Sequence, residues 1–254
     1  MFISKHMEQS IVILGSRGKL IATLVQPVQA HTLVIMLHGL MSHRNCGFFR
    51  ELSKQLSYMQ IATMRFDFNG HGQSDGKFQD MTVENELIDA QCVLNYAIEC
   101  GWIKKIILVG HSLGGVVAGL LAADNPTNVK AIVQVSPAAV MHDDALAGRI
   151  MNATYNPNII PPYVRVFFVK KIGRAYLEAA RDIDVFARSC SFAGRVCLIH
   201  GRKDRIVPFS YSEQYHRLYP NSELHIVDKE NHLLLHDRMK IIHIITDFIK
   251  SLNN

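Results

Sequence analysis

A serine between glycines, in the run GHSLGG at positions 110–115, is the strongest chemical signal in the chain. A serine hydroxyl is a weak nucleophile, so it has to be held at a fixed point beside a base. The apolar run Ile106–Val109 precedes the motif and a helical segment follows it, which puts Ser112 at a strand-to-helix turn. There the glycines of a G-x-S-x-G pattern are required because backbone and helix approach closely, and the helix N-terminus brings amide groups towards a developing oxyanion. The motif therefore predicts Ser112 as a nucleophile, whereas the same letters in a loop would be a chance meeting.

Two polar residues near the end of the chain fit the partners that such a serine needs. The acid and the histidine are expected to follow the serine in that order. The strand-like run Val196–Ile199 leads into a loop that ends at Asp204, and Leu224–Val227 leads into a loop that ends at His232. Both loops follow the carboxyl end of a late strand, where they can meet Ser112. We expect Asp204 to fix the tautomer of His232 and to stabilise its charged form.

Three other residues compete for these roles. Asp228 lies very close to its strand end and is interpreted as a turn residue. His236 is expected to open the last helix. His200 is interpreted as a hydrogen-bonded histidine at a strand end rather than a base.

Backbone groups are expected to hold the negative charge that develops on the substrate. The loop HGLM at 38–41 follows the strand-like run Leu33–Leu37 and reaches the same edge of the sheet. We predict the N–H groups of Leu40 and Leu113 as the oxyanion donors, so that their side chains matter little.

The sequence contains no pattern that predicts a metal site or a disulfide framework. The 13 histidines are scattered, without an H-E-x-x-H or a comparable ligand spacing, so no metal is predicted. The cysteines are odd in number and no pair has C-x-x-C spacing, which argues against a disulfide framework or a structural zinc site. Cys92, Cys100 and Cys197 lie among apolar neighbours and are expected to be buried. The opening MFISKHMEQS lacks the apolar core of a signal peptide, so a cytoplasmic, reducing compartment is expected.

Alternating strand-like and helix-like segments would position these residues. Short runs that are apolar on both faces are typical of central strands in a parallel sheet covered by helices. These runs are Leu33–Leu37, Ile61–Phe66, Ile106–Val109, Ala131–Val135, Val196–Ile199 and Leu224–Val227, with helices expected at about Asn45–Tyr58, Val83–Glu99, Leu113–Ala123, Ser210–Leu218 and His236–Leu252.

The ends of some elements carry local signals of their own. Thr82 is expected to be the N-cap of the second helix, with Asn85 at the position that usually holds Glu or Gln in a capping box. Ile11–Leu14 and Leu20–Val25, joined by the turn GSRG, indicate an antiparallel hairpin at one edge of the sheet.

One apolar stretch resembles a membrane span in length. Residues 106–123 contain hardly any polar side chain, but His111 and Ser112 interrupt them and the first part is β-branched. A buried strand that turns into a buried helix explains the stretch better.

The alternation predicts a doubly wound, mostly parallel α/β sheet, and one segment interrupts it. From about 138 to 190, Gly148, Pro157, Pro161 and Pro162 lie close together among helix-like pieces. An insertion after a central strand is expected to cover the carboxyl edge of the sheet, where ligands bind in open α/β sheets. A structural excursion without a substrate role is the alternative.

Length and composition agree with one globular domain. The chain has 254 residues, of which 48% are hydrophobic and 19% charged, and we expect a single domain over 1–254 with the cap inside it. The formal charge of +5 is spread over the chain without a run of five basic residues, so a nucleic-acid partner is not expected.

With these residues in view, the whole chain resembles the α/β-hydrolase family, and within it the bacterial cinnamoyl (feruloyl) esterase branch. The resemblance implies the α/β-hydrolase fold with an inserted cap that receives an aromatic acyl group, and it implies the same triad of Ser112, Asp204 and His232. The matching segments are HGLMSHRN (38–45), RFDFNGHGQSDGKF (65–78), GHSLGG (110–115), TYNPNIIP (154–161) and CLIHGRKDRIVP (197–208).

The chain departs from that branch at two positions. Leu113 stands where members often have glutamine, which matters little because only its N–H is used. Asp144 and Tyr155 match the polar lining of the family's cap, but Met151 falls where a polar residue that holds a phenolic hydroxyl is expected. A thioether is a weak acceptor and cannot donate, which leaves room for a more apolar acyl group.

These observations predict a carboxylic ester hydrolase that works through an acyl-enzyme on small aryl or short-chain alkyl esters, without a cofactor. A lipase or thioesterase on acylglycerols or acyl-CoA is the alternative within hydrolases, and a non-catalytic binding protein of the same fold is the alternative outside them. A dehalogenase would require an aspartate nucleophile at position 112, where this chain has a serine. The expected partner is a small-molecule ester, with no nucleic acid and no stable membrane insertion, and a homodimer stays open.

Overall fold

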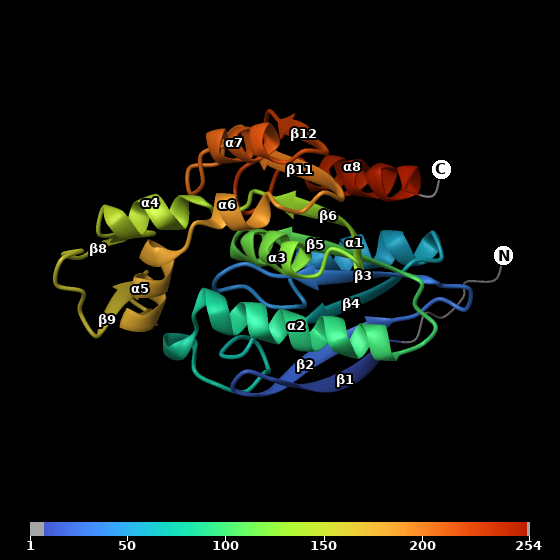
Figure 1. Cartoon of the computed structure of the whole chain (residues 1–254), viewed down its shortest axis with the longest axis horizontal. Coiled ribbons are helices and arrows are strands. Elements are labelled where there is room, and N and C mark those ends of the chain that lie inside the picture. The colour runs from blue at the N-terminus through green and yellow to red at the C-terminus, as the bar shows by residue number, and fades with distance from the viewer. Residues whose placement is uncertain (1–7, 253–254) are drawn as a thin grey trace.

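The structure, a computed structural model, describes residues 8–252. Residues 1–7 and 253–254 lie outside it, and with them most of the opening segment MFISKHMEQS. Its centre is a sheet of eight strands in the order β1-β2-β4-β3-β5-β6-β11-β12 (Figure 1). The strands are β1 (Glu8–Gly15), β2 (Gly18–Val25), β3 (Thr32–Leu37), β4 (Ala62–Phe66), β5 (Lys105–His111), β6 (Val129–Val135), β11 (Arg195–Gly201) and β12 (Ser222–Val227).

The pairing confirms the predicted sheet. β3, β4, β5, β6, β11 and β12 run parallel to their neighbours among themselves, whereas β1 and β2 form the antiparallel hairpin expected at one edge. β3 and β4 are buried almost throughout, because helices cover both faces of the sheet. β12 differs from the prediction of a strand apolar on both faces: most of its residues are only half-buried, because it forms the other edge.

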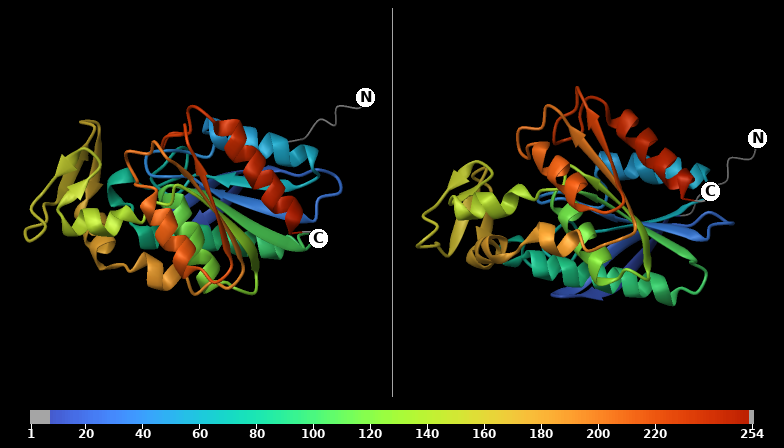
Figure 2. Two further views of the ribbon diagram at one scale, coloured as in Figure 1. Left: turned by 90° about the horizontal axis from the view of Figure 1, so that it is seen from above. Right: turned by 45° about the horizontal axis from the view of Figure 1, so that its top comes forward.

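Helices on both faces bury two separate apolar clusters against the sheet (Figure 2). α1 (Gly47–Tyr58) and α8 (Arg238–Ser251) pack on one face, and α2 (Val83–Glu99), α3 (Leu113–Asp124) and α7 (Ser210–Leu218) pack on the other. A short 3-10 helix, η1 (Phe78–Asp80), precedes α2. The last helix begins after Asp237 and not at His236, because the backbone N–H groups of both residues donate to the Glu230 carboxylate in the preceding loop.

Local signals in two helices have the predicted consequences. Thr82 is the N-cap of α2, and its hydroxyl accepts a hydrogen bond from the Asn85 N–H at 3.1 Å. The apolar stretch 106–123 consists of β5 and nearly all of α3, which is buried on every side. Within residues 8–252 no helix combines the length and the apolarity that crossing a membrane requires.

Between β6 and β11 the chain leaves the sheet, as expected for a cap after a central strand. Its elements are α4 (Val140–Leu146), β7 (Arg149–Ile150), β8 (Ala153–Thr154), β9 (Tyr163–Val166), β10 (Lys170–Gly173), α5 (Arg174–Asp182) and α6 (Val185–Ser189). The β7–β8 and β9–β10 pairs form two small sheets of their own, at the end of the molecule away from both termini (Figure 2). These pairs were not predicted, because strands of two to four residues carry too little periodicity to be recognised.

Candidate active site

Ser112 lies at the sharp turn between β5 and α3, in a conformation that few side chains adopt. Its φ is 56°, and its backbone N–H donates to the Val135 carbonyl at 2.9 Å. A Cβ added to Gly110 would collide with the Gly114 carbonyl, and one added to Gly114 would collide with the Leu37 carbonyl. The flanking glycines therefore allow the helix to start directly on top of the strand end, which holds the serine out of the sheet.

The structure brings Ser112, His232 and Asp204 into one hydrogen-bonded chain. His232 Nε2 lies 2.9 Å from Ser112 Oγ, and His232 Nδ1 lies 2.7 Å from Asp204 Oδ2. With Nδ1–H donating to the carboxylate, Nε2 is free to accept from the serine hydroxyl. All three side chains are buried in the protein, so little water competes for these hydrogen bonds.

Asp204 is held in its charged form by the groups around it. Burial alone would raise its pKa, but hydrogen bonds from His200, His232 and the Val207 N–H outweigh burial and hold the pKa of this carboxyl below its usual range. Asp204 Oδ1 accepts from the N–H groups of Ile206 and Val207 at 2.9 and 2.8 Å. The loop after β11 therefore fixes one carboxylate oxygen and leaves the other to His232.

The rival residues lie elsewhere or are already engaged. Asp228 is exposed and pairs with Arg202 at 2.7 Å. His200 is fully buried, and its ring nitrogens lie 2.7 Å from Ser212 Oγ and 2.9 Å from the Val207 carbonyl, as expected for a satisfied strand-end histidine. The sequence did not indicate that His200 Nε2 also lies 3.3 Å from the Asp204 carboxylate.

Two side chains that the sequence did not single out for this role, Glu230 and His111, shape the His232 loop. The Glu230 carboxylate accepts from the N–H groups of Asn231, His236 and Asp237, which closes the loop into a compact turn. His111 Nε2 lies 2.9 Å from the His232 carbonyl. Burial lowers the pKa of His111 to about 3, so its ring is neutral and donates to that carbonyl.

The loop with Leu40 is held against Ser112 by another neutral histidine. Gly39 packs so closely on the serine that an added Cβ would come within 2.8 Å of Ser112 Cβ. His38 Nε2 accepts from the Phe68 N–H at 3.2 Å, and its Nδ1 donates to the Gly39 carbonyl at 2.9 Å. Burial, helped by the nearby His71, lowers the pKa of His38 well below its ordinary value, which keeps this arrangement of donor and acceptor.

The segment RFDFNGHGQSDGKF works as scaffolding for that loop. The Asp67 carboxylate accepts from the backbone and the guanidinium of Arg44 and from the Gln73 N–H. Asn69 ties the same segment to α2, because its N–H donates to Asp89 at 2.8 Å. The residues of this segment thus form a buried polar network, which supports the loop beside Ser112 without contacting Ser112 itself.

A cavity of about 340 Å³ opens beside Ser112 between the sheet edge and the cap. Leu40 and Leu113, the predicted oxyanion residues, line it together with Ser112. Its remaining walls are mostly apolar and come from both the cap and the loops of the sheet, among them Val140, Met141, Ile150, Leu177, Ile206 and Val207.

Two of the three cap residues predicted to bind substrate line this cavity. Met151 is 37% exposed and lies in its wall. Asp144 also lines it, but its carboxylate is paired with Arg149 at 2.9 Å. Tyr155 is not one of the lining residues: its hydroxyl donates to the Ala145 carbonyl at 3.2 Å, so it supports the end of α4. In a segment this irregular, the sequence pattern could not show which side chains face inwards.

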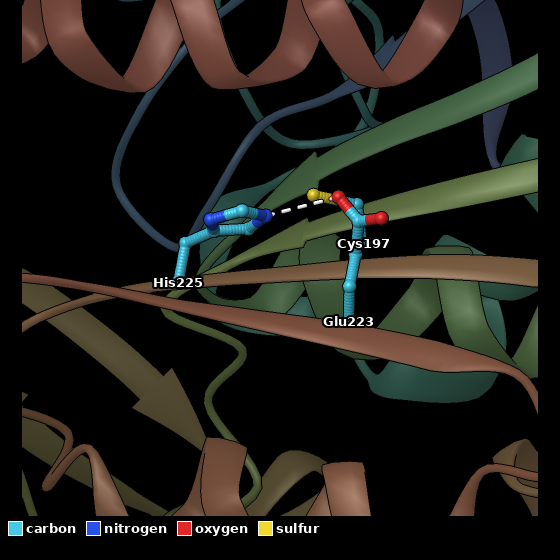
Figure 3. Close-up of side chains that lie close together, drawn as sticks. All are labelled: Cys197, Glu223 and His225. Atoms are coloured by element: carbon cyan, nitrogen blue, oxygen red, sulfur yellow. Dashed lines mark hydrogen bonds and ion pairs between the residues drawn. The ribbon is translucent and has the colours of Figure 1, made fainter. Parts of the chain in front are cut away.

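A second cluster of polar side chains lies on β11 and β12, away from the cavity (Figure 3). Cys197, Glu223 and His225 have potential ligand atoms within 4.8 Å of one another. His225 Nε2 lies 2.9 Å from Glu223 Oε1, and Arg195 approaches the other Glu223 oxygen at 3.4 Å. Burial raises the pKa of the Cys197 thiol, so its proton stays on the sulfur. The cluster is thus satisfied by its own hydrogen bonds, and it lies towards the amino ends of its strands, opposite the edge that holds Ser112.

The cysteines are only partly as expected. All five are free thiols, and Cys197 is buried as predicted, but Cys92 and Cys100 are half-buried on α2 and at its end.

Comparison with known proteins places this geometry in a family. Residues 28–163, more than half of the chain, match the family described as serine aminopeptidase, S33. The structure is similar to that of Est1E from Butyrivibrio proteoclasticus with ferulic acid bound, with 28% identity, a TM-score of 0.89, and coverage of 92% of this chain and 95% of that one.

Curated relatives match over a shorter range. The monoglyceride lipases of mouse and rat are 30% identical over 132 residues and 28% identical over 139 residues, which is 47% and 50% of this chain. The match covers only 41% and 43% of the length of those two proteins. With the fold, the serine turn and the family match in agreement, the chain belongs to the serine aminopeptidase S33 family of α/β-hydrolases.

Proposed function

We propose that the protein is a carboxylic ester hydrolase that works through an acyl-enzyme formed on Ser112. The observation that supports this most directly is the position of His232, which lies within hydrogen-bonding distance of both Ser112 and Asp204 beside an apolar cavity. This is the relation between nucleophile, base and orienting acid that acyl transfer requires.

The reaction follows from these contacts. Ser112 Oγ attacks the ester carbonyl while His232 Nε2 takes the hydroxyl proton, and Asp204 stabilises the imidazolium that results. The N–H groups of Leu40 and Leu113 are proposed to hold the oxyanion of the tetrahedral intermediate. His232 then gives its proton to the leaving alcohol, and the acyl group stays on Ser112. His232 then deprotonates a water molecule, which attacks this acyl-enzyme, and the return of the proton from His232 to Ser112 Oγ releases the acid.

The cavity favours an acyl group with a predominantly apolar surface. Its walls are aliphatic for the most part, and the Asp144 carboxylate at its margin is already paired with Arg149. Small aryl or alkyl acyl groups fit this description, and the structural similarity to an enzyme with bound ferulic acid supports an aromatic one. The Met151 thioether cannot donate to a phenolic hydroxyl, which favours unsubstituted over hydroxylated rings.

A monoacylglycerol is the second candidate substrate. The similarity to the monoglyceride lipases of mouse and rat and the apolar cavity both favour it. The two candidates differ in chain-length dependence, because each buried methylene adds about 0.8 kcal/mol of binding free energy while the pocket can still accept it. Rates on p-nitrophenyl esters of graded chain length, compared with methyl cinnamate, methyl ferulate and a monoacylglycerol, distinguish them.

The test of the mechanism is replacement of the nucleophile. Ser112→Ala should lower kcat by about 10⁴-fold or more and abolish labelling by an organophosphorus probe. Ser136→Ala is the matched control, since Ser136 is also buried, follows a central strand and has a positive φ of 46°. We expect this control to keep its activity and its label. A Ser112→Ala protein that keeps more than about 1% of the wild-type kcat would exclude the acyl-enzyme mechanism.

A further inference from the structure

The β9–β10 hairpin of the cap ends in three exposed apolar residues that no part of residues 8–252 covers. Phe167, Phe168 and Val169 form its tip and are 47%, 89% and 75% exposed. The opposite side of the hairpin is anchored, because Val164 and Ile172 are buried in the protein core. The tip is therefore a fixed apolar projection, at the end of the molecule away from both termini (Figure 2).

Turn formation does not explain the two phenylalanines. Phe167 and Phe168 have φ values of 49° and 61°, in the left-handed region where a turn favours glycine or asparagine. Bulky aromatic residues at these positions cost backbone free energy, and here they expose their rings to water as well. Such a combination is expected where the exposed rings have a binding role.

The segment that contains the tip is rich in cations, of which Arg149 is paired with Asp144 just outside the segment. From 145 to 177 the chain has Arg149, Arg165, Lys170, Lys171 and Arg174 and contains no Asp or Glu. The whole chain has 27 Lys and Arg and 22 Asp and Glu, so without these five cations the remainder, 22 against 22, is neutral. All of the net charge of the protein therefore lies in the segment that contains the tip.

The charges are arranged around aromatic rings on the outer face of the hairpin. Arg165 and Lys171 are paired across the two strands, and both stand over the ring of Tyr163, at 5.7 and 4.2 Å from its centroid. Tyr163 is itself 38% exposed. Aromatic rings at headgroup depth with neighbouring Lys and Arg are the composition that suits the surface of an anionic bilayer.

We propose that the β9–β10 hairpin docks the protein onto an anionic lipid surface. Phe168 and Val169 enter the boundary between headgroups and acyl chains, while Arg165 and Lys171 contact the lipid phosphates. A lipid surface is favoured over a protein partner because the apolar tip is small and convex, whereas a stable protein interface buries about 800 Å² on each side. The insertion is shallow and reversible, since the hairpin tip contributes only three apolar residues.

The tip is also connected to the candidate active site. Phe167 and Met151 both line the cavity beside Ser112, and the Phe167 N–H donates to the Asn152 side chain at 2.9 Å. A docked hairpin would therefore hold the cavity near the membrane surface, where apolar esters gather. This consequence for turnover rests on the proposed function, whereas docking itself does not.

Co-sedimentation with vesicles measures docking without any turnover. We expect the wild-type protein and Ser112→Ala to bind vesicles of equal parts phosphatidylglycerol and phosphatidylcholine, to bind pure phosphatidylcholine more weakly, and to lose the difference at high salt. Phe168→Ser should lower the partition coefficient about tenfold or more, and Arg165→Gln or Lys171→Gln about fivefold each. Because Ser112→Ala cannot turn over substrate, loss of esterase activity and loss of docking are separate results.

Matched variants far from the cap control for general surface effects. Val28 is 94% exposed in the loop before the amino end of β3, and Lys54 is exposed on α1. Val28→Ser and Lys54→Gln should bind vesicles like the wild type. In Phe168→Trp, brominated lipids should quench the tryptophan at 168, whereas the native Trp102 of the wild type should stay unquenched.

Three outcomes would overturn the proposal. The first is a wild-type protein that does not sediment with anionic vesicles, and the second is equal losses in Phe168→Ser and Val28→Ser. The third is a wild-type protein that does not bind vesicles but self-associates with increasing concentration, and in which Phe168→Ser abolishes this association. That result would show that the tip contacts a second copy of the chain.

Discussion

Around Ser112, burial and hydrogen bonding keep two histidines uncharged and one aspartate charged. Desolvation lowers the pKa values of His38 and His111, and each uses a neutral ring to hold a loop of the site. Asp204 is buried as well, but hydrogen bonds from His200 and His232 and the Val207 N–H overcome the effect of burial and keep it charged. The site thus presents one carboxylate to one histidine and surrounds the pair with uncharged rings.

Replacing one carboxylate oxygen of Asp204 by an amide nitrogen tests the assignment of Asp204 as the acid of the triad. Asp204→Asn should lower kcat by about 10⁴-fold, because an amide no longer selects the His232 tautomer that accepts from Ser112. Asp228→Asn is the control, since Asp228 is exposed and contacts Arg202. Steady-state kinetics on p-nitrophenyl acetate measures both. A larger loss in Asp228→Asn than in Asp204→Asn would reverse the assignment.

Met151 decides how the cavity treats a polar acyl group. Met151→Gln adds a donor and an acceptor at similar volume, so it should raise kcat/KM for methyl caffeate relative to methyl cinnamate by roughly tenfold. The same change should lower kcat/KM for medium-chain alkyl esters. Met239→Gln, on the exposed part of α8, is the matched control and should leave all three ratios unchanged. Equal ratios in Met151→Gln and the wild type would show that this side chain does not contact the acyl group.

At the scale of elements, α2 carries a buried acid under the cap. Glu86 is 2% exposed in the first turn of the helix, and its Oε2 has no hydrogen-bond partner among the described residues. Burial, with Asp89 nearby, raises its pKa well above 4.5, so the folded protein keeps it protonated where the unfolded chain would not. Helix α2 therefore packs against the sheet at the cost of one carboxyl group that resists ionisation.

The unfolding free energy of Glu86→Gln, measured at two pH values, tests how much this buried carboxyl group destabilises the folded protein. A pKa raised by folding means that Glu86 favours the folded state below about pH 4.5 and opposes it increasingly as the pH rises above that value. Relative to the wild type, Glu86→Gln should therefore gain more unfolding free energy at pH 8 than at pH 5, as urea denaturation can show. Glu84→Gln, exposed on the same helix, is the control and should have no such pH dependence. A gain that is equal at both pH values would exclude a buried, protonated Glu86.

For the whole molecule, we expect three histidines with lowered pKa values to contribute to the response to acid. Burial lowers the pKa values of His38, His71 and His111, in the last two to about 4 and about 3, whereas the ordinary value is 6.5. Below pH 6.5 the unfolded chain takes up protons that the folded protein does not bind. The contribution of these residues to stability is thus present above pH 6.5 and is lost progressively as the pH falls towards the folded-state values.

We therefore expect His71→Asn to flatten the acid side of the stability curve. Between pH 6.5 and about 4 the slope of unfolding free energy against pH should decrease relative to the wild type, even if the variant is less stable throughout. His243→Gln, at an exposed position of α8, should keep the wild-type slope. Thermal melts at several pH values provide the measurement, and an unchanged slope in His71→Asn would contradict the neutral, buried state of this ring.

Much of this architecture could be predicted from the sequence, because its signals are local. Apolar runs on both faces identified the central strands, and the turn GSRG identified the edge hairpin. α2 and α7 have the predicted bounds, Val83–Glu99 and Ser210–Leu218, since helical periodicity and an N-cap are properties of neighbouring residues. The order serine, aspartate, histidine after successive strands likewise predicted which loops would meet, because the carboxyl ends of parallel strands share one edge.

Contacts between distant segments were decided by the tertiary structure alone. Only the folded chain shows that Ser112 and His232, 120 residues apart, lie 2.9 Å from each other. The roles of His38 and Glu230, and the contact of Tyr155 with α4 in place of the cavity, depend on which backbone groups lie next to them, and no pattern of residue types encodes that. The paired strands β9 and β10, with their exposed tip, were missed for the same reason: four residues hold too little periodicity to reveal a strand, and exposure is a property of the whole surface.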